Sequence, residues 1–501
     1  MKINRLFLSG VISCALAFQP LACGAEPVRL TLADSIHMAL ESDESIESAE
    51  AQREASEHAF HAARRSHGPS VNWNSQAYRI GGRDYQASND AHDAYGSPHT
   101  VTQTTVIGYL MNDPDYPVVS EQTGTVGSYA YHNTFANSWN LTVPLYTGGQ
   151  LEGRIDAARY QLNRADLDTE NTRQEVRYRV AEAYANVIYR ENLALVAQEA
   201  VNKGNTQLEL VRAMFEEGSV AEADLLMMKV NVANYQQALV SANAAVEIAK
   251  ATLAAAVGLP QDSDVEAVDL FSYEPYHRTL PECENYALEH RPDGLAADYD
   301  IKTAEAQKDS AAAGYRPQVS VAGSQNIADN KPFRSERSNA WSLGLTFSWN
   351  VFDNGVTAEN VRQAEATTNA YEAAKRKIKK NILLETRSAY VQMKAAETNI
   401  ATTKVAVQQA EDSHIIAQVR YEEGVDGLLP VTDAQEKLAQ ARSNYQKALY
   451  EYNLSRSMLE KAMGVPVKFD AKRYRELTLA GASANRAERE ASLHQEKAAE
   501  K

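Results

Sequence analysis

Cysteine is scarce in this sequence, which excludes a fold held together by disulfides. The chain has 3 cysteines among its 501 residues. Two of them, Cys14 and Cys23, lie in or beside an apolar segment at the N-terminus. Ordinary cleavage of that segment would leave Cys283 without a partner in the chain, so no disulfide framework can form.

Long apolar runs are equally rare. Beyond the N-terminal segment, no stretch reaches the roughly 18 consecutive apolar residues of a transmembrane helix. If the mature chain crosses a membrane, we therefore expect it to do so with β-strands, whose backbone groups can pair with one another in a closed barrel.

The sequence also lacks an excess of positive charge and the common catalytic motifs. Its net charge is -16 at pH 7, whereas a nucleic-acid-binding protein usually carries a basic face. There is no Cys-x-x-Cys pair, no glycine-rich phosphate loop and no Gly-x-Ser-x-Gly nucleophile motif. We therefore expect no enzymatic activity, no cofactor and no nucleic-acid partner.

Two histidines raise the question of a metal site. His58 and His61 stand three residues apart in a predicted helix, a spacing at which two imidazoles can share an ion. No acidic or cysteine cluster accompanies them in the sequence, and exposed helical histidines are usually solvated. We therefore expect no bound metal.

The first 25 residues have the layout of a signal peptide. Lys2 and Arg5 precede an apolar run over residues 6–18, and small residues follow at 22–25. Cleavage after Ala25 is one alternative. Lipidation of Cys23 is the other, because residues 21–24 read LACG, similar to a lipoprotein box, although Pro20 stands where that box usually has leucine.

The remainder of the chain is an internal duplication. Residues 215–218 read FEEG and residues 421–424 read YEEG, an offset of 206 (421 − 215 = 206). The same offset relates residues 257–260 (VGLP) to residues 463–466 (MGVP). A long register without gaps indicates two copies of one structural unit.

The front of each copy matches at a larger offset. Residues 39–41 and 287–289 both read ALE, an offset of 248 (287 − 39 = 248). The 42 additional residues of the first copy (248 − 206 = 42) fall within 81–137, where Gly, Asp, Asn, Tyr and Thr predict a long surface loop. The predicted division is a first repeat over 26–260, a linker over 261–283, a second repeat over 284–466 and a charged, flexible tail over 467–501.

Alternating apolar residues predict four strands, two in each copy. The alternation runs from Trp139 to Leu145 and from Trp341 to Val351, and shorter partners are expected at residues 71–78 and 318–324. About 10 residues suffice for a tilted strand to cross a bilayer. Every tryptophan of the chain falls in these segments, and we expect all of them at the membrane interface: Trp73, Trp139, Trp341 and Trp349.

Long helices complete each copy. Residues 357–420 hold neither proline nor glycine, and about 60 residues at ~1.5 Å rise give on the order of 95 Å. Residues recur at spacings of three and four in both copies, which is typical of helices packed as coiled coils. These predicted seam residues are Ile378, Ile382, Glu385, Ala389, Met393, Ala396 and Ile400, and in the first copy Val176, Val180, Ala183 and Val187. Gly218 and Gly424 each follow a Glu-Glu pair, where glycine typically ends a helix and lets the chain turn back.

Four strands are too few to close a membrane-spanning barrel, and open sheet edges cannot stay unpaired in lipid. We therefore expect several chains to pool their strands, and three copies give twelve. The expected fold class is an α+β membrane protein. Long antiparallel helices form a coiled-coil barrel, and four strands per chain contribute to the 12-stranded β-barrel of a homotrimer.

The chain resembles the TolC-like family of outer-membrane factors. The resemblance rests on the two Glu-Glu-Gly turns, the Gly-Leu-Pro and Gly-Val-Pro ends, and the runs at 32–41 (LADSIHMALE), 145–149 (LYTGG) and 351–355 (VFDNG). It covers residues 30–466 and implies a trimeric outer-membrane channel-tunnel with its helical part in the periplasm. The implied partners are a periplasmic adaptor (membrane fusion) protein, an inner-membrane pump or ABC exporter, and outer-membrane lipid.

The resemblance also implies a periplasmic gate at the helix turns, where an aspartate contacts a tyrosine and an arginine. The first two positions hold Asp224 and Tyr421, but the arginine position holds Asp426. Two facing acids would repel, so either another cation substitutes or the tip is held less tightly. Asp433 matches one of the family's two entrance acids and Pro430 replaces the other. A ring of three Asp433 carboxylates would attract cations.

A soluble periplasmic coiled-coil scaffold or adaptor is the alternative, because it would share the leader and the long helices. Such a protein has no need of duplicated amphipathic strands that carry tryptophan. Drugs, metals and secreted proteins stay open as cargo of the duct. For residues 81–137 our hypothesis is an outward-facing cap or recognition loop.

Overall fold

The computed structural model describes residues 28–79, 99–109, 117–126, 133–260, 263–329, 331–335 and 338–467. The expected signal peptide with Cys23, and the predicted tail beyond residue 467, lie outside these residues. The chain divides into two compact units. The first draws on Met1–Ala49, Thr169–Pro292 and Lys380–Lys501, and the second on Glu50–Asp168 and Asp293–Lys379.

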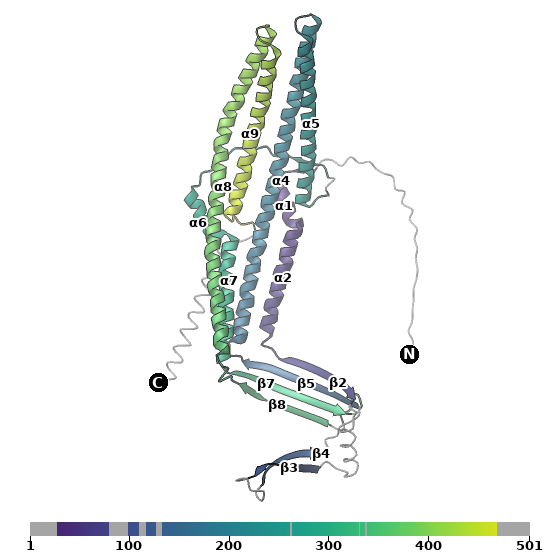
Figure 1. Cartoon of the computed structure of the whole chain (residues 1–501), viewed down its shortest axis with the longest axis vertical. Helices are drawn as coiled ribbons and strands as arrows, with labels where there is room; N and C mark the ends of the chain where they lie inside the picture. The colour runs from purple at the N-terminus through teal and green to yellow at the C-terminus, as the bar shows by residue number, and fades with distance from the viewer. Residues whose placement is uncertain are drawn as a thin grey trace, which may run out of the picture. The chain divides into compact units, whose positions relative to one another are not determined.

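Helices dominate the described residues and alternate with short groups of strands (Figure 1). The elements are, in chain order, β1 (Val28–Leu30), α1 (Leu32–Ser42), α2 (Glu44–Arg65), β2 (Ser70–Arg79), β3 (His99–Tyr109), β4 (Pro117–Val126), β5 (Asn133–Tyr146), α4 (Gln150–Glu216), α5 (Glu222–Val257), β6 (Val265–Ala267), α6 (Leu280–His290), α7 (Pro292–Ala312), the 3-10 turn η2 (Ala313–Tyr315), β7 (Gln318–Asp329), β8 (Ser338–Ser348), α8 (Val356–Glu422) and α9 (Leu428–Ala462).

Matching sequence segments fold into matching elements. Helices α4 and α8 each have 67 residues, and their first residues differ by 206 (356 − 150 = 206). Helices α1 and α6 each have 11 residues and differ by 248 (280 − 32 = 248). The structure places β6 and the first residues of α6 inside the stretch 261–283, for which the sequence predicted only a linker.

The long helices of the first unit pack through the residues whose spacing predicted a coiled-coil seam. One apolar cluster joins α4 to α1 and α5, through Ala39 and Leu253. A second apolar cluster joins α8 to α6 and α9, through Cys283 and Tyr452. The predicted seam residues that are buried are Val176, Val180, Ala183, Val187, Ile382, Ala389, Met393, Ala396 and Ile400.

Helix α5 has one buried and one exposed apolar side. Among the described residues it is the one helix long and apolar enough, by length and composition alone, to cross a membrane. Met228 and Leu253 are buried in the first unit, whereas a second set of apolar side chains is exposed. The exposed set is Leu226, Val230, Val240 and Ile248.

In the second unit, α4 and α7 approach closely at Gly153. A Cβ atom added there would lie 2.7 Å from the backbone oxygen of Ala306 and 2.9 Å from Ser310 Cβ. Helix α2 contacts α4 through Arg53, whose Nε donates to Asp166 Oδ1 at 2.5 Å. These helices lead directly into the strands of the same unit.

The four predicted strands form one antiparallel sheet in the order β2-β5-β7-β8 (Figure 1). Strands β5 and β7 are longer than the sequence pattern predicted, with 14 and 12 residues. Strand β8 begins and ends earlier in the chain than predicted, and its last residue is Ser348. The placement of Trp349 within a strand was therefore wrong: Trp349 lies just beyond β8, where its Nε1 donates to Tyr315 O at 3.1 Å.

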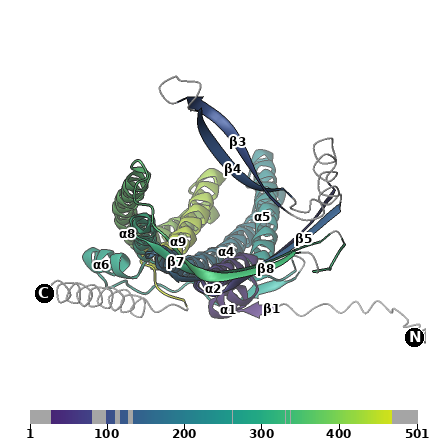
Figure 2. The ribbon, with the colours of Figure 1, turned by 90° about the horizontal axis from the view of Figure 1, so that it is seen from below.

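Residues 81–137 are not a simple loop, which corrects the prediction. Strands β3 and β4 pair antiparallel within this stretch (Figure 2), and β5 already begins at Asn133. The sequences HTVTQTTVIGY and PVVSEQTGTV are rich in valine and threonine. Such β-branched residues favour strands, and this local preference was hidden by the turn-forming composition of the longer stretch.

Candidate gate at the helix turns and candidate membrane-facing sheet

The two helix turns of the first unit have the same backbone geometry. Gly218 and Gly424 have φ of 78° and 71°, a left-handed conformation that glycine adopts without steric cost. The amide of Ser219 donates to Met214 O, and that of Val425 donates to Arg420 O, both at 2.8 Å. These bonds satisfy carbonyl groups left free at a helix end. In each turn a glycine lies just past the end of the long helix.

Tyr421 lies in the apolar core beneath these turns. It packs in one cluster with residues of all four helices, among them Val211, Leu225 and Leu428. Its side chain is 3% exposed, and its hydroxyl has no hydrogen-bond partner among the described residues. Burial raises the pKa of Tyr421, and the charge of Asp224 raises it further. The structure thus places Asp224 close enough to Tyr421 for its charge to act on the hydroxyl.

Asp426 is paired within its own turn. Arg420 Nε donates to Asp426 Oδ2 at 2.6 Å, and Arg420 Nη2 donates to Oδ1 at 3.3 Å. The hydrogen bond to Arg420 lowers the pKa of Asp426 below its usual range and, together with the charge of Arg420, outweighs the opposing effect of burial. Arg420 therefore balances the charge of Asp426 within the second turn itself.

Asp433 is also compensated by a cation. Its Oδ2 accepts from Lys437 Nζ at 2.6 Å, one helical turn further along α9. Both side chains are largely exposed, so the pair is sensitive to salt. A lysine this close offsets the negative charge that a ring of Asp433 carboxylates would otherwise present.

One face of the four-stranded sheet is apolar. On β8, Leu343, Leu345 and Phe347 alternate with polar or small residues and are largely exposed. Because side chains alternate between the faces of a strand, these three share one face. Gly323 lies between Leu141 and Leu343 in the register and lets the two leucines approach across β7.

Three tryptophans lie in one row across this sheet. Trp73 pairs with Trp139, Trp139 with Gln325, and Gln325 with Trp341. The rings of Trp73 and Trp139 are stacked with centroids 6.0 Å apart. All three indoles are exposed in the single chain. The fourth, Trp349, lies eight positions after Trp341 (349 − 341 = 8), or roughly 27 Å along a strand at ~3.4 Å per residue.

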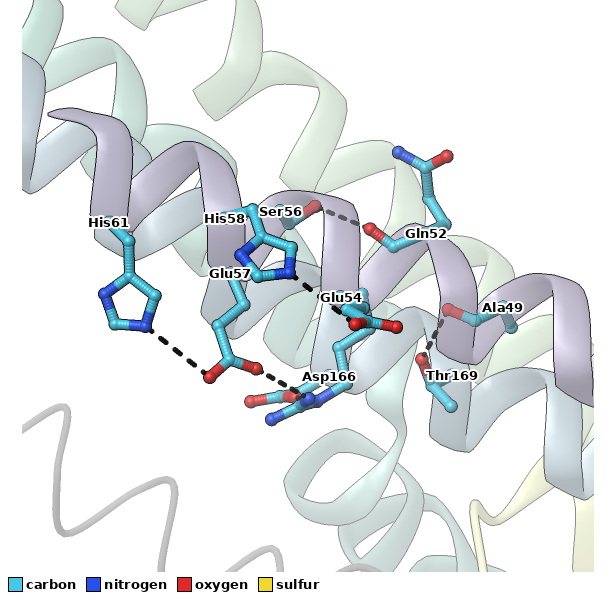
Figure 3. Close-up of polar contacts among 10 residues, drawn as sticks. Ala49, Gln52, Glu54, Ser56, Glu57, His58, His61, Asp166 and Thr169 are labelled. Atoms are coloured by element: carbon cyan, nitrogen blue, oxygen red, sulfur yellow. Dashed lines mark hydrogen bonds and ion pairs between the residues drawn. The ribbon is translucent and has the colours of Figure 1, made fainter. Parts of the chain in front are cut away.

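His58 and His61 each face an acid on their own helix (Figure 3). His58 Nε2 lies 3.6 Å from Glu54 Oε1, and His61 Nε2 lies 3.7 Å from Glu57 Oε1. These are contacts between adjacent turns of α2. In the part of the chain that the structure describes, no three His, Cys, Asp or Glu side chains gather as a metal site would require.

Comparison with known proteins identifies the family. A sequence profile of the outer membrane efflux protein family matches residues 35–259 and 285–465. The chain therefore belongs to this family, and it is a TolC-like outer-membrane protein. The family consists of channel proteins rather than enzymes.

Individual relatives are distant. Nodulation protein T of Rhizobium leguminosarum bv. trifolii is 23% identical over 393 residues, which cover 76% of this chain and 82% of the relative. The cobalt-zinc-cadmium resistance protein CzcC of Cupriavidus metallidurans is 22% identical over 334 residues, covering 66% and 78%. The outer membrane channel CmeC of Campylobacter jejuni has a TM-score of 0.68 at 16% identity, covering 89% of this chain and 88% of that one. This likeness establishes the fold.

Sequence reasoning missed the part that Arg420 plays at the turn. The residue stands in the last turn of α8, where a cation is favourable near free carbonyl groups. Its position four residues before Gly424 and six before Asp426 was a signal that it could reach across the turn. The resemblance drew attention to the position after Gly424 instead.

Proposed function

We propose that this chain is one protomer of a homotrimeric channel-tunnel, which gives the exit path through the outer membrane for a tripartite efflux pump or a type I secretion system. The observation that carries the proposal is the four-stranded sheet, which has one apolar face and two open edges. Among the described residues, β2 and β8 each pair on one side only. Unpaired edges are unstable in lipid, and pooling the strands of three chains removes them.

The row of tryptophans supports a membrane position for this sheet. Trp73, Trp139 and Trp341 share one register row, as the residues of an interfacial belt do. Trp349 lies just beyond the helix-proximal end of β8, eight residues after Trp341 (349 − 341 = 8) and therefore at most roughly 27 Å from it. A tilted strand of this length matches the ~25 Å apolar band of a transmembrane barrel.

The exposed apolar side of α5 supports association of the helical part. Val230, Val240 and Ile248 are more than half exposed in the single chain. Exposed apolar patches of this kind mark surfaces that another chain covers. In the proposed trimer, the neighbouring protomer covers them and the helices continue the barrel as a periplasmic tunnel.

The helix turns are the proposed periplasmic gate. Buried Tyr421 and nearby Asp224 hold the turns of the two repeats together, and the Arg420–Asp426 pair stiffens the second turn. The proposed partners are a periplasmic adaptor (membrane fusion) protein and an inner-membrane pump or ABC exporter. The duct carries out no chemistry, so its cargo is set by the pump.

The mass of the purified protein tests the assembly. We expect a trimer in detergent by light scattering, and precipitation or mixed aggregates in plain buffer. The variant Val240→Arg places a charge on the exposed apolar side of α5 and lowers the temperature at which the trimer dissociates. Asn243→Arg, at an exposed polar position of the same helix that lies off this apolar side, is the matched control. A monomer that is soluble without detergent would favour the periplasmic scaffold instead.

A further inference from the structure

A polar cleft lies between α4, α8 and α9 in the first unit, away from the helix turns. Its volume is about 510 Å³. Two apolar side chains, Ile415 and Leu438, line it together with polar and charged groups. The polar and charged lining that bears on the argument is Lys203 and Gln207 from α4, Glu411 and His414 from α8, and Arg442 from α9.

Two buried side chains that line this cleft have free nitrogen atoms. Gln207 is 6% exposed and His414 is 7% exposed. Gln207 Nε2 and His414 Nε2 have no hydrogen-bond partner within the described residues. Gln207 Nε2 is a hydrogen-bond donor, and His414 Nε2 donates when it carries a proton. A buried donor without a partner is unfavourable, so a ligand that accepts a hydrogen bond from each nitrogen is favoured at this site.

The charges around the cleft leave one cation available. Arg442 contacts Glu199 and Glu411, and the latter distance is 2.6 Å. Lys203, one helical turn from Gln207, forms no ion pair among the described residues. Burial lowers the pKa of His414, and the positive charges of Lys203 and Arg442 lower it further, against a backbone hydrogen bond that raises it. A positive field excludes cations and attracts anions.

We propose that this cleft binds a small organic carboxylate, whose oxygens accept from Gln207 and His414 and whose charge is balanced by Lys203. Both nitrogens are shielded from solvent in the free chain, so binding turns the two side chains toward the cleft. Ile415 and Leu438 contact the aliphatic part of the ligand. The proposal concerns a site that is distinct from the turns, and it does not depend on the duct function.

Ligand binding and protonation of His414 are then coupled. A carboxylate next to the imidazole favours its charged form and raises its pKa. By linkage, affinity for the carboxylate increases as the pH falls from 8 toward 6. The charged groups that line the cleft with His414 are Lys203 on α4, Glu411 on α8 and Arg442 on α9. Glu199 on α4 pairs with Arg442.

Succinate is a suitable probe of the purified full-length protein, with its uncharged diamide as control. We expect saturable binding of succinate by calorimetry, none of the diamide, and a rise in the pKa of His414 by NMR titration. Affinity should increase by about tenfold for each unit of that rise. Equal binding of the two compounds, or no saturable binding at all, would overturn the proposal and leave an internal water as the partner of the two nitrogens.

Two variants locate the site. Gln207→Leu removes one free donor, and His414→Leu introduces the residue that the first repeat has at the equivalent position, Leu208 (208 + 206 = 414). Each should weaken succinate binding at least about tenfold, the effect of losing one hydrogen bond to a charged group. Gln237→Leu on α5, outside the cleft, should bind as the unsubstituted protein does. Unchanged binding in both cleft variants would place any succinate site elsewhere.

Discussion

The hydroxyl of Tyr421 is an unusual group at the scale of single residues, because it is buried beside Asp224 and makes no hydrogen bond among the described residues. Its ring packs in the apolar cluster that joins the four helices near their turns. The ring and the hydroxyl therefore have different energetic roles, which substitutions can separate.

Tyr421→Phe keeps the ring and removes the hydroxyl. Since an unpaired buried hydroxyl costs roughly 1–3 kcal/mol, we expect this variant to be at least as stable as the unsubstituted protein. Tyr421→Ala leaves a cavity and should lose about 3–5 kcal/mol. Thermal unfolding followed by helical circular dichroism measures both. A marked loss of stability in the Phe variant would show that the hydroxyl has a partner, with Asp224 the first candidate.

The Arg420–Asp426 pair predicts a pH dependence. Arg420 lowers the folded-state pKa of Asp426, so the stabilisation is fully present above the unfolded pKa of about 3.9. It is lost as the pH falls through the lower folded pKa. Arg420→Gln should raise the pKa of Asp426 toward its ordinary value in an NMR titration of the carboxyl carbon. Lys437→Gln, which breaks the separate Asp433 pair, should leave the Asp426 titration unchanged.

The sequence predicted these turns better than their side-chain contacts. Gly218 and Gly424 were identifiable because few residues other than glycine suit a left-handed helix end. The partner of Asp426 was not, because a contact across a turn depends on the rotamer of a long side chain. Tyr421 was found through the resemblance, and its burial explains why an aromatic residue is suited to that position.

At the scale of elements, a glycine in α4 tests the packing of the second unit. Gly153→Val would place a side chain against the backbone of Ala306, where overpacking costs typically about 1–3 kcal/mol. Glu359 occupies the equivalent position in α8 (153 + 206 = 359) and is exposed. Glu359→Val should therefore change the melting temperature little. Equal effects of the two substitutions would contradict the close approach of α4 and α7.

The sheet offers a test of its two faces. Leu345→Arg places a charge on the apolar face of β8, where it should cost about 2–4 kcal/mol in the middle of a bilayer. Thr346→Arg, the next residue, points to the polar face and should be tolerated. The yield of assembled protein in isolated outer membranes distinguishes them. Loss of assembly in both variants, or in neither, would contradict a sheet with one lipid-facing side.

Helices and strands whose apolar residues recur with a regular period in the sequence were predictable, and those without such a pattern were not. The absence of proline and glycine in residues 357–420 marked α8 almost to its ends. The hairpin of β3 and β4 was missed because its valines and threonines stand among turn-forming residues. Strand β8 was placed too late because the alternation continues through Trp349 to Val351, after the last ladder pair with β7 at Ser348.

At the scale of the whole molecule, the two sequence repeats and the two compact units divide the chain at different places. The repeats follow one another along the sequence, whereas each compact unit takes segments from both repeats. The reason is the length of α4 and α8, which are 67 residues each and belong partly to both units. Sequence offsets could reveal the repeats, but the units depend on contacts between distant segments.

Single-channel conductance in a planar lipid bilayer tests the central claim, that three such chains form a gated duct. We expect the detergent-purified trimer to insert and show small, uniform conductance steps, which become larger in Tyr421→Ala because the turns separate. Arg212→Gln, which removes an exposed ion pair with Glu216 on α4, serves as the control and should leave the steps unchanged. Correctly inserted trimers that never conduct, in either the unsubstituted protein or Tyr421→Ala, would contradict the account.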